Sequence, residues 1–116
     1  MDDLEWDYRN IDLSLDFSEA DKRDNVAELR KILETFKSFL RDDNMEKVKT
    51  SFEMLIRIYG CFVDRRDMTE EYVRFGLERL EIKDKSDWKK LCESYPVPKR
   101  KDYCFKEGKK TIESLI

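Results

Sequence analysis

The sequence contains no histidine. That absence excludes Ser-His-Asp and Cys-His catalysis, HExxH metalloproteases and every zinc site that uses a histidine ligand. The phosphate-binding patterns GxxxxGKS/T and GxGxxG are also missing, and three glycines are too few for such a loop and its turns. Acidic pairs such as Glu78 with Glu81 stand where a helix end is expected, so a solvated or capping role explains them. We therefore expect a protein that is not an enzyme and that binds no cofactor and no metal.

Glycine and proline are scarce, with three and two residues among 116, whereas 44% of the residues are charged. Because a β domain rich in tight turns needs more of both, this composition favours helices. No apolar run approaches the ~20 residues of a membrane-spanning helix. The acidic start Met1–Asp3 is also unlike a secretory signal. We expect one helical domain that does not bind a membrane.

The three cysteines are Cys61, Cys92 and Cys104, and no CxxC motif of a redox or zinc site exists among them. Cys61 and Cys92 fall on apolar helical stripes, where a free thiol acts as a small core residue. We therefore expect reduced cysteines and an intracellular location, in the cytoplasm, the nucleus or both.

Charge is distributed unevenly along the chain, although the net charge is only −3. Residues 1–24 contain nine acids and three bases, whereas residues 83–116 contain six acids and ten bases. Such a gradient either orients a charged partner or draws the two ends of the chain together. A solvated surface with chance asymmetry is the simpler alternative.

Residues 11–17 alternate strictly between apolar and polar side chains, which is the period of a β-strand, and Leu4, Trp6 and Tyr8 continue this alternation upstream. We expect an extended acidic and aromatic arm over residues 1–17, which either packs along its own domain or binds a partner. The partner-binding candidates in this arm are Trp6, Tyr8, Leu13, Leu15 and Phe17.

Apolar residues at spacings of three and four predict a helical domain over residues 18–95. Its expected helices cover residues 18–41, 43–64, 69–82 and 86–95. Pro96-Val97-Pro98 ends this domain, and a basic tail follows over residues 96–116, with room for a short terminal helix near 109–115. The predicted fold is all-α: a compact bundle of four to five helices with an extended N-terminal arm and a basic C-terminal tail.

The stretch Met54–Val63 is apolar on nearly every face and is interrupted by Arg57 and Gly60. A helix of this kind is normally central to its domain, or is half covered by a second copy of the chain. Glycine costs about 1 kcal/mol relative to alanine inside a helix, so we expect Gly60 to permit a close crossing by another helix. Arg57 is expected to pack its stem and to direct its guanidinium towards the surface.

Basic and aromatic residues alternate between positions 83 and 110, a combination that supplies phosphate contacts and rings for stacking. The contacts to an acidic protein or to nucleic acid are expected from Lys89, Lys90, Lys99, Arg100, Lys101, Tyr103 and Lys106. Because the chain is acidic overall, whereas nucleic-acid-binding modules are usually basic, we favour a non-catalytic protein-interaction, adaptor or regulatory role. Nucleic-acid binding is the alternative. A small helical chain of this kind suits a viral accessory protein or a small regulatory subunit.

Overall fold

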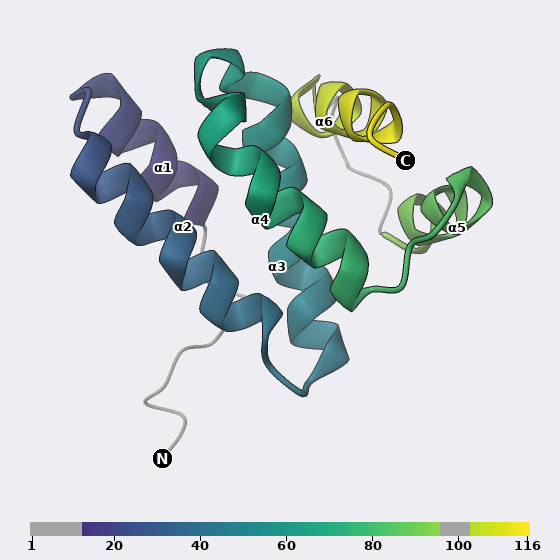
Figure 1. Cartoon of the computed structure of the whole chain (residues 1–116). Helices are drawn as coiled ribbons and strands as arrows, with labels where there is room; N and C mark the ends of the chain where they lie inside the picture. The colour runs from purple at the N-terminus through teal and green to yellow at the C-terminus, as the bar shows by residue number, and fades with distance from the viewer. Residues whose placement is uncertain (1–12, 96–102) are drawn as a thin grey trace.

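Six α-helices make up most of the computed structural model, which describes residues 13–95 and 103–116 (Figure 1). No strand is present in those two ranges. The predicted all-α class is therefore confirmed, with six helices rather than four to five. The helices are α1 (Leu13–Lys22), α2 (Val26–Leu40), α3 (Met45–Cys61), α4 (Arg66–Arg79), α5 (Lys85–Ser94) and α6 (Tyr103–Glu113), and a one-turn 3₁₀ helix over Val63–Arg65 links α3 to α4.

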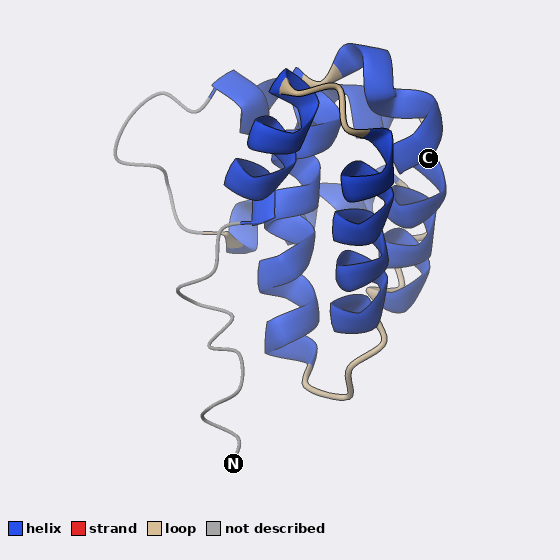
Figure 2. Ribbon diagram, turned by 90° about the vertical axis from the view of Figure 1, so that its left-hand side faces the viewer, coloured by secondary structure: helices blue, strands red, loops and turns tan. Residues whose placement is uncertain are grey.

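Helix α3 is the centre of the fold. It packs against α1, α2, α4 and α6, and its residues Leu55, Ile56 and Ile58 are fully buried. In Figure 1, α1 and α2 lie to the left of α3 and α4, whereas α5 and α6 lie to the right. Figure 2 shows helices packed side by side, with connecting loops at their ends. The expected central helix is confirmed up to Cys61, where α3 ends; Val63 lies beyond it and is 58% exposed.

The single helix predicted over residues 18–41 is in fact two helices. The Asn25 amide donates a hydrogen bond to the Ala20 carbonyl at 3.0 Å, which closes the end of α1. Asp24 adopts a left-handed backbone conformation with φ of 54°, and its amide donates to the Asp21 carbonyl at 3.0 Å. The Asn25 side chain then caps the start of α2. This helix end followed by an N-cap reverses the chain, so that α1 packs back against α2 and α3.

The extended arm predicted over residues 1–17 is wrong from Leu13 onward, because Leu13–Phe17 forms the first part of α1. Leu13, Phe17 and Ala20 recur at helical spacing and are buried on one face of α1. Apolar residues four positions apart satisfy both the period of a strand and that of a helix, and packing against α3 selects the helix. Residues 1–12 lie outside the described part of the chain.

Helix α6 belongs to the core, which corrects the prediction of a basic tail for residues 103–116, whereas residues 96–102 lie outside the described part of the chain. Helix α6 is longer than the short helix expected near 109–115, and it buries Phe105 and Ile112. It crosses α3 at two glycines, which confirms the close crossing expected at Gly60. A Cβ atom on either Gly60 or Gly108 would overlap backbone atoms of the opposite helix.

Cys61 and Cys104 form a disulfide, so the expectation of a free Cys61 thiol is wrong. The bond joins the last residue of α3 to the second residue of α6 across a Cα–Cα distance of 5.1 Å. Because disulfides persist in oxidising environments, the cysteines no longer argue for a reducing compartment. Cys92 on α5 is a half-buried free thiol, and its burial raises its pKa to about 11.

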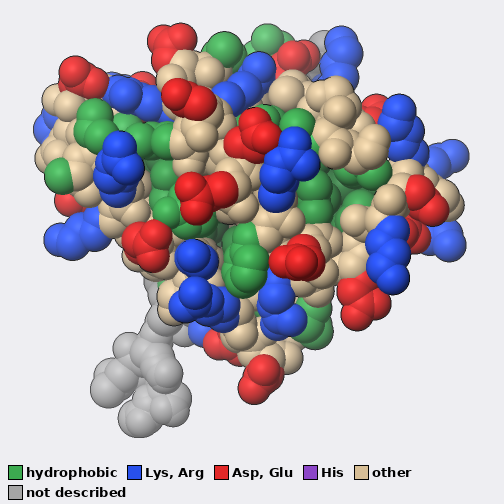
Figure 3. All heavy atoms as spheres, in the orientation of Figure 1, with side chains coloured by type: hydrophobic (Ala, Val, Ile, Leu, Met, Phe, Trp, Pro, Cys, Tyr) green, Lys and Arg blue, Asp and Glu red, His purple; other side chains and the backbone are tan. Residues whose placement is uncertain are grey.

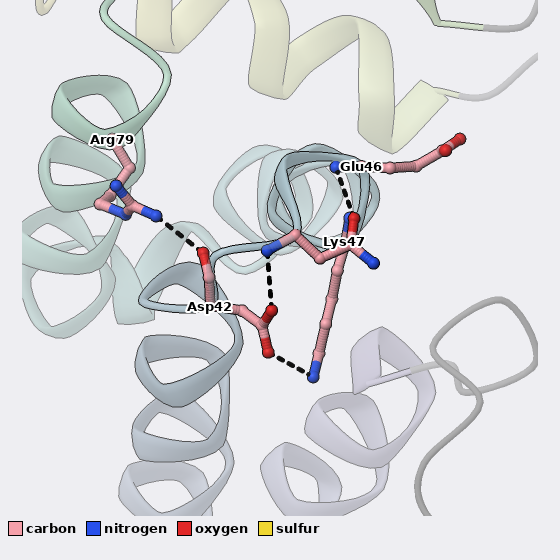
Figure 4. A network of polar contacts seen from close by, with 5 residues as sticks. Asp42, Glu46, Lys47 and Arg79 are labelled. Carbon is pink, nitrogen blue, oxygen red and sulfur yellow. Dashed lines mark hydrogen bonds and ion pairs between the residues drawn. The ribbon is translucent and has the colours of Figure 1, made fainter. Parts of the chain in front are cut away.

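Two arginines of α4 bind the carbonyl ends of neighbouring helices. Arg79 donates from Nε to the Leu40 carbonyl at 2.7 Å. It also donates from Nη2 to the Asp42 carbonyl at 2.7 Å (Figure 4). Arg66 donates from Nε to the Tyr59 carbonyl at 2.7 Å, in the last turn of α3. A cation at the carbonyl end of a helix is favoured by the helix dipole, so α4 stabilises the ends of both α2 and α3.

The turn between α2 and α3 is held by the carboxylate of Asp42 (Figure 4). This carboxylate accepts hydrogen bonds from Lys47 Nζ and from the Asn44 amide, both at 2.9 Å. The bonds to Lys47 and Asn44 hold the Asp42 pKa below its usual value. The turn therefore presents α3 in a defined direction to the rest of the core.

Candidate partner-binding surface

Helices α5 and α6 form a layer on one side of α3. The indole Nε1 of Trp88 on α5 donates to the Lys109 carbonyl of α6 at 3.2 Å. The rings of Tyr95 and Phe105 meet edge to face with centroids 5.9 Å apart. Tyr95 also donates its hydroxyl to the Lys49 carbonyl of α3 at 2.8 Å, and burial raises its pKa well above the usual value. Helix α6 is thus held on two sides, by α3 and by α5.

The outward face of α6 carries Tyr103, Lys106 and Lys110, at helical spacing and all exposed. We call these three residues the α6 stripe. Tyr103 is 67% exposed, the highest value among the exposed large apolar side chains of the described residues. The predicted contacts Lys89 and Lys90 are also exposed, on α5. The structure therefore places four of the predicted contacts on one two-helix layer.

Charge on this layer is mixed rather than strongly basic. The described residues between 83 and 116 include seven lysines and five acids. Figure 3 likewise shows basic and acidic side chains interspersed over one face of the molecule. The remaining predicted contacts, Lys99, Arg100 and Lys101, lie outside the described residues. The layer has a small positive excess, which is weaker than the basic surface typical of a nucleic-acid-binding module.

The described partner-binding residues of the predicted arm lie in different environments, two buried and one exposed. Leu13 and Phe17 are buried in the core, where the Phe17 ring meets that of Phe62 edge to face at 5.1 Å. Leu15 points outward and is 58% exposed. The remaining two candidates, Trp6 and Tyr8, lie in the segment that the structure does not describe. Among the described partner-binding candidates of the arm, Leu13, Leu15 and Phe17, Leu15 is thus the one that a partner can reach without unfolding α1.

Arg57 is half-buried on α3, which agrees with the expected packing of its stem. Its Nη2 forms an ion pair with Glu53 Oε2 at 3.1 Å, and its guanidinium lies over the Phe105 ring, 5.8 Å from the centroid. The contact with Phe105 adds a further link between α3 and α6. A structural role therefore accounts for the position of Arg57 without a catalytic one.

A cavity of about 360 Å³ opens beside the disulfide, where the end of α1 meets the α3–α4 connection, and sequence reasoning did not predict it. Asp21, Asp24, Cys61, Asp64 and Arg65 are among the residues that line it. Arg65 pairs with Asp21 at 2.8 Å and with Asp24 at 2.7 Å. These two hydrogen bonds raise the pKa of Arg65 above its ordinary value. The sequence did contain a signal for the disulfide. Gly60 directly precedes Cys61, and Gly108 follows Cys104 by one helical turn, so a close helix crossing at the two glycines brings the two cysteines together.

A second cavity of about 510 Å³ lies between α2 and α4, lined by both acidic and basic side chains. Tyr72, in its wall, donates its hydroxyl to Glu34 Oε2 at 2.7 Å. Burial and this carboxylate raise the Tyr72 pKa to about 12. The tyrosine therefore remains protonated near neutral pH and acts as a hydrogen-bond donor between α4 and α2.

No group of three or more Cys, Asp or Glu side chains in residues 13–95 and 103–116 is placed to hold a metal ion. None of the described helices is long and apolar enough to cross a membrane.

Comparisons of the chain with protein-family models, with curated proteins and with solved structures find no match. What the protein does must therefore be argued from its own surfaces.

Proposed function

We propose that this protein is a non-catalytic interaction protein that binds an acidic partner protein through the α6 stripe. The observation that carries the proposal is the exposure of Tyr103 beside Lys106 on a helix whose opposite face is locked into the core. Exposed tyrosines are frequent anchors of protein interfaces. A helix that is already ordered loses little conformational freedom on binding, which favours affinity.

Lysines around the tyrosine supply the electrostatic part of the recognition. Lys106 and Lys110 follow Tyr103 by about one and two turns of α6, and Lys89 and Lys90 are exposed on α5. Complementary charge raises the association rate and selects against wrong partners more than it adds affinity. An acidic protein surface with a pocket for one aromatic ring is the matching partner.

The mixed charge of the layer favours a protein over nucleic acid. The chain carries a net charge of −3, and acids such as Asp87 and Glu93 share α5 with the lysines. Carboxylates beside a phosphate backbone repel it, whereas they can pair with bases on a protein surface. Nucleic-acid binding is thus the competing outcome in the test.

The test uses the full chain as bait in a nuclease-treated lysate of the native host. We expect Tyr103→Ala with Lys106→Glu and Lys110→Glu to lose a protein that the wild type captures. The matched control is Arg23→Glu with Lys31→Glu, which reverses two exposed cations on the opposite side of the molecule and should retain capture. Equal capture by the stripe variant would refute the proposal.

Anisotropy with a labelled single strand and a labelled duplex, at low and high salt, tests the alternative. Binding that falls steeply with salt and that requires the same lysines would assign the layer to nucleic acid instead.

A further inference from the structure

The disulfide joins two elements that are otherwise held by packing. Cys61 is the last residue of α3, and Cys104 lies in the first turn of α6. The glycine crossing at Gly108 lies one turn further along α6. The first turn of α6, which carries Tyr103, is therefore the part of the helix most directly held by the covalent bond.

Cys61 lies in the wall of a cavity beside the disulfide. Cys61 lines the cavity of about 360 Å³, whereas Cys104 is not among the lining residues. Both cysteines are half-buried. A small thiol that enters this cavity therefore meets the Cys61 end of the bond first.

The cavity is negatively charged. Its walls contain the carboxylates of Asp21, Asp24 and Asp64 and a single guanidinium, that of Arg65. Arg65 is engaged by Asp21 and Asp24, and the exposed Asp64 forms no ion pair with any described residue. An attacking thiolate that carries a second negative charge is repelled here, whereas one that carries an ammonium group is attracted.

We propose that Cys61–Cys104 is a reducible clip, opened through this cavity by a small cationic or neutral thiol in preference to an anionic one. The thiolate attacks Cys61 Sγ, the Cys61–Cys104 bond breaks, and Cys104 leaves as a thiolate that takes a proton from water. A second thiolate attacks the mixed disulfide and releases Cys61. Two electrons pass to the protein, and two thiol molecules are oxidised to one disulfide.

Opening the clip loosens the first turn of α6 and with it the position of Tyr103. Phe105 and Ile112 remain apolar anchors after reduction, so α6 stays attached while its start becomes mobile. Reduction would then lower the affinity of the α6 stripe for its partner. This consequence rests on the proposed function, but the selectivity of the reduction does not.

The experiment measures the rate of reduction of the full chain by cysteamine, 2-mercaptoethanol and mercaptoacetate at equal thiolate concentration. Cys92→Ser is the background, so that one cysteine pair is followed by alkylation and mass spectrometry. Each rate is divided by the rate of the same thiol on a neutral small disulfide. We expect cysteamine to react about fivefold faster than mercaptoacetate at low salt, with the ratio approaching one in about 1 M salt.

Asp64→Asn should reduce the ratio, and the matched control Glu93→Gln on α5 should leave it unchanged. A ratio of one in the wild type, or no response to Asp64→Asn, would overturn the charge selectivity. Hydrogen exchange gives the second readout: reduction should speed exchange by about tenfold at the amides of residues 107–109, which donate to the carbonyls of the first turn of α6. Unchanged exchange at these amides would overturn the inference that the disulfide holds the start of α6 in place. Neither readout depends on a partner, so a failure of this inference can be distinguished from a failure of the proposed function.

Discussion

The two sides of α3 are packed in different ways. Towards α1, α2 and α4, the contact is made by large side chains, such as Phe17, Phe36 and Phe52, which are fully buried. Towards α6, the backbones approach each other at Gly60 and Gly108. The first arrangement depends on filled volume, whereas the second depends on the absence of side chains and on a covalent bond.

This difference indicates where the fold tolerates change. Large side chains can shift rotamers when a neighbour changes, but two crossing backbones leave little room for adjustment. The α1–α4 part also has arginine contacts that hold its helix ends, whereas α6 depends on the disulfide at its start. We expect α6 to be the element most sensitive to single changes.

The largest effect is expected from removal of the disulfide. The bond closes a sequence separation of 43 residues, for which the chain-entropy relation predicts a loss of about 4 kcal/mol in the free energy of unfolding. Urea denaturation of Cys61→Ala with Cys104→Ala measures it. Cys92→Ala is the matched control and should cost about 1 kcal/mol or less. Equal stability of the double variant would show that α6 does not depend on the bond.

A methyl group at the glycine crossing is expected to have the next largest effect. Gly108→Ala places a Cβ against the Ile56 backbone and should cost about 2–3 kcal/mol. Gly76→Ala is the control on the other side of α3, because its Cβ meets the ring of Phe52, a side chain that can move. A smaller loss at position 108 than at position 76 in thermal or urea unfolding would reverse the comparison.

Loss of an arginine contact at a helix end should have a moderate effect in the α1–α4 part. Arg79→Met keeps the apolar stem but removes two hydrogen bonds to carbonyls, and should cost about 2 kcal/mol. Arg74→Met removes an exposed ion pair with Glu70 and should change stability by less than about 0.5 kcal/mol. Equal effects in chemical denaturation would contradict the role assigned to Arg79.

The smallest expected change is an increase in the free energy of unfolding, from a substitution in the connection between α4 and α5. Glu81 directly follows Leu80, the C-cap residue of α4, and has φ of 58°. The Ile82 amide donates to the Leu77 carbonyl at 2.9 Å. Because glycine adopts this left-handed conformation without a Cβ clash, Glu81→Gly should raise the free energy of unfolding by about 1 kcal/mol. Asp24→Gly should gain less, since it removes the ion pair with Arg65. A loss of stability in Glu81→Gly would refute this explanation.

Local sequence signals predicted some elements well and others poorly. The apolar stretch from Met54 and the glycine at position 60 predicted a central helix with a close crossing, and both are present. The extended arm predicted over residues 1–17 failed at its described residues, 13–17, because apolar positions four apart suit a helix equally well. For the candidate surface, the sequence predicted Tyr103 and Lys106, while the buried face of α6 that orders them was not foreseen.

Taken alone, the amino-acid sequence determined the helical class, the central helix and the exposed lysines, because each follows from composition or from contacts within a few residues of each other. The tertiary structure decided the turn at Asp24, the burial of α6 and the pairing of Cys61 with Cys104. These features depend on which surfaces meet across 40 or more residues of chain or on the space left beside a helix end. Which surfaces pack together is determined by the free energy of the whole core rather than by any local pattern.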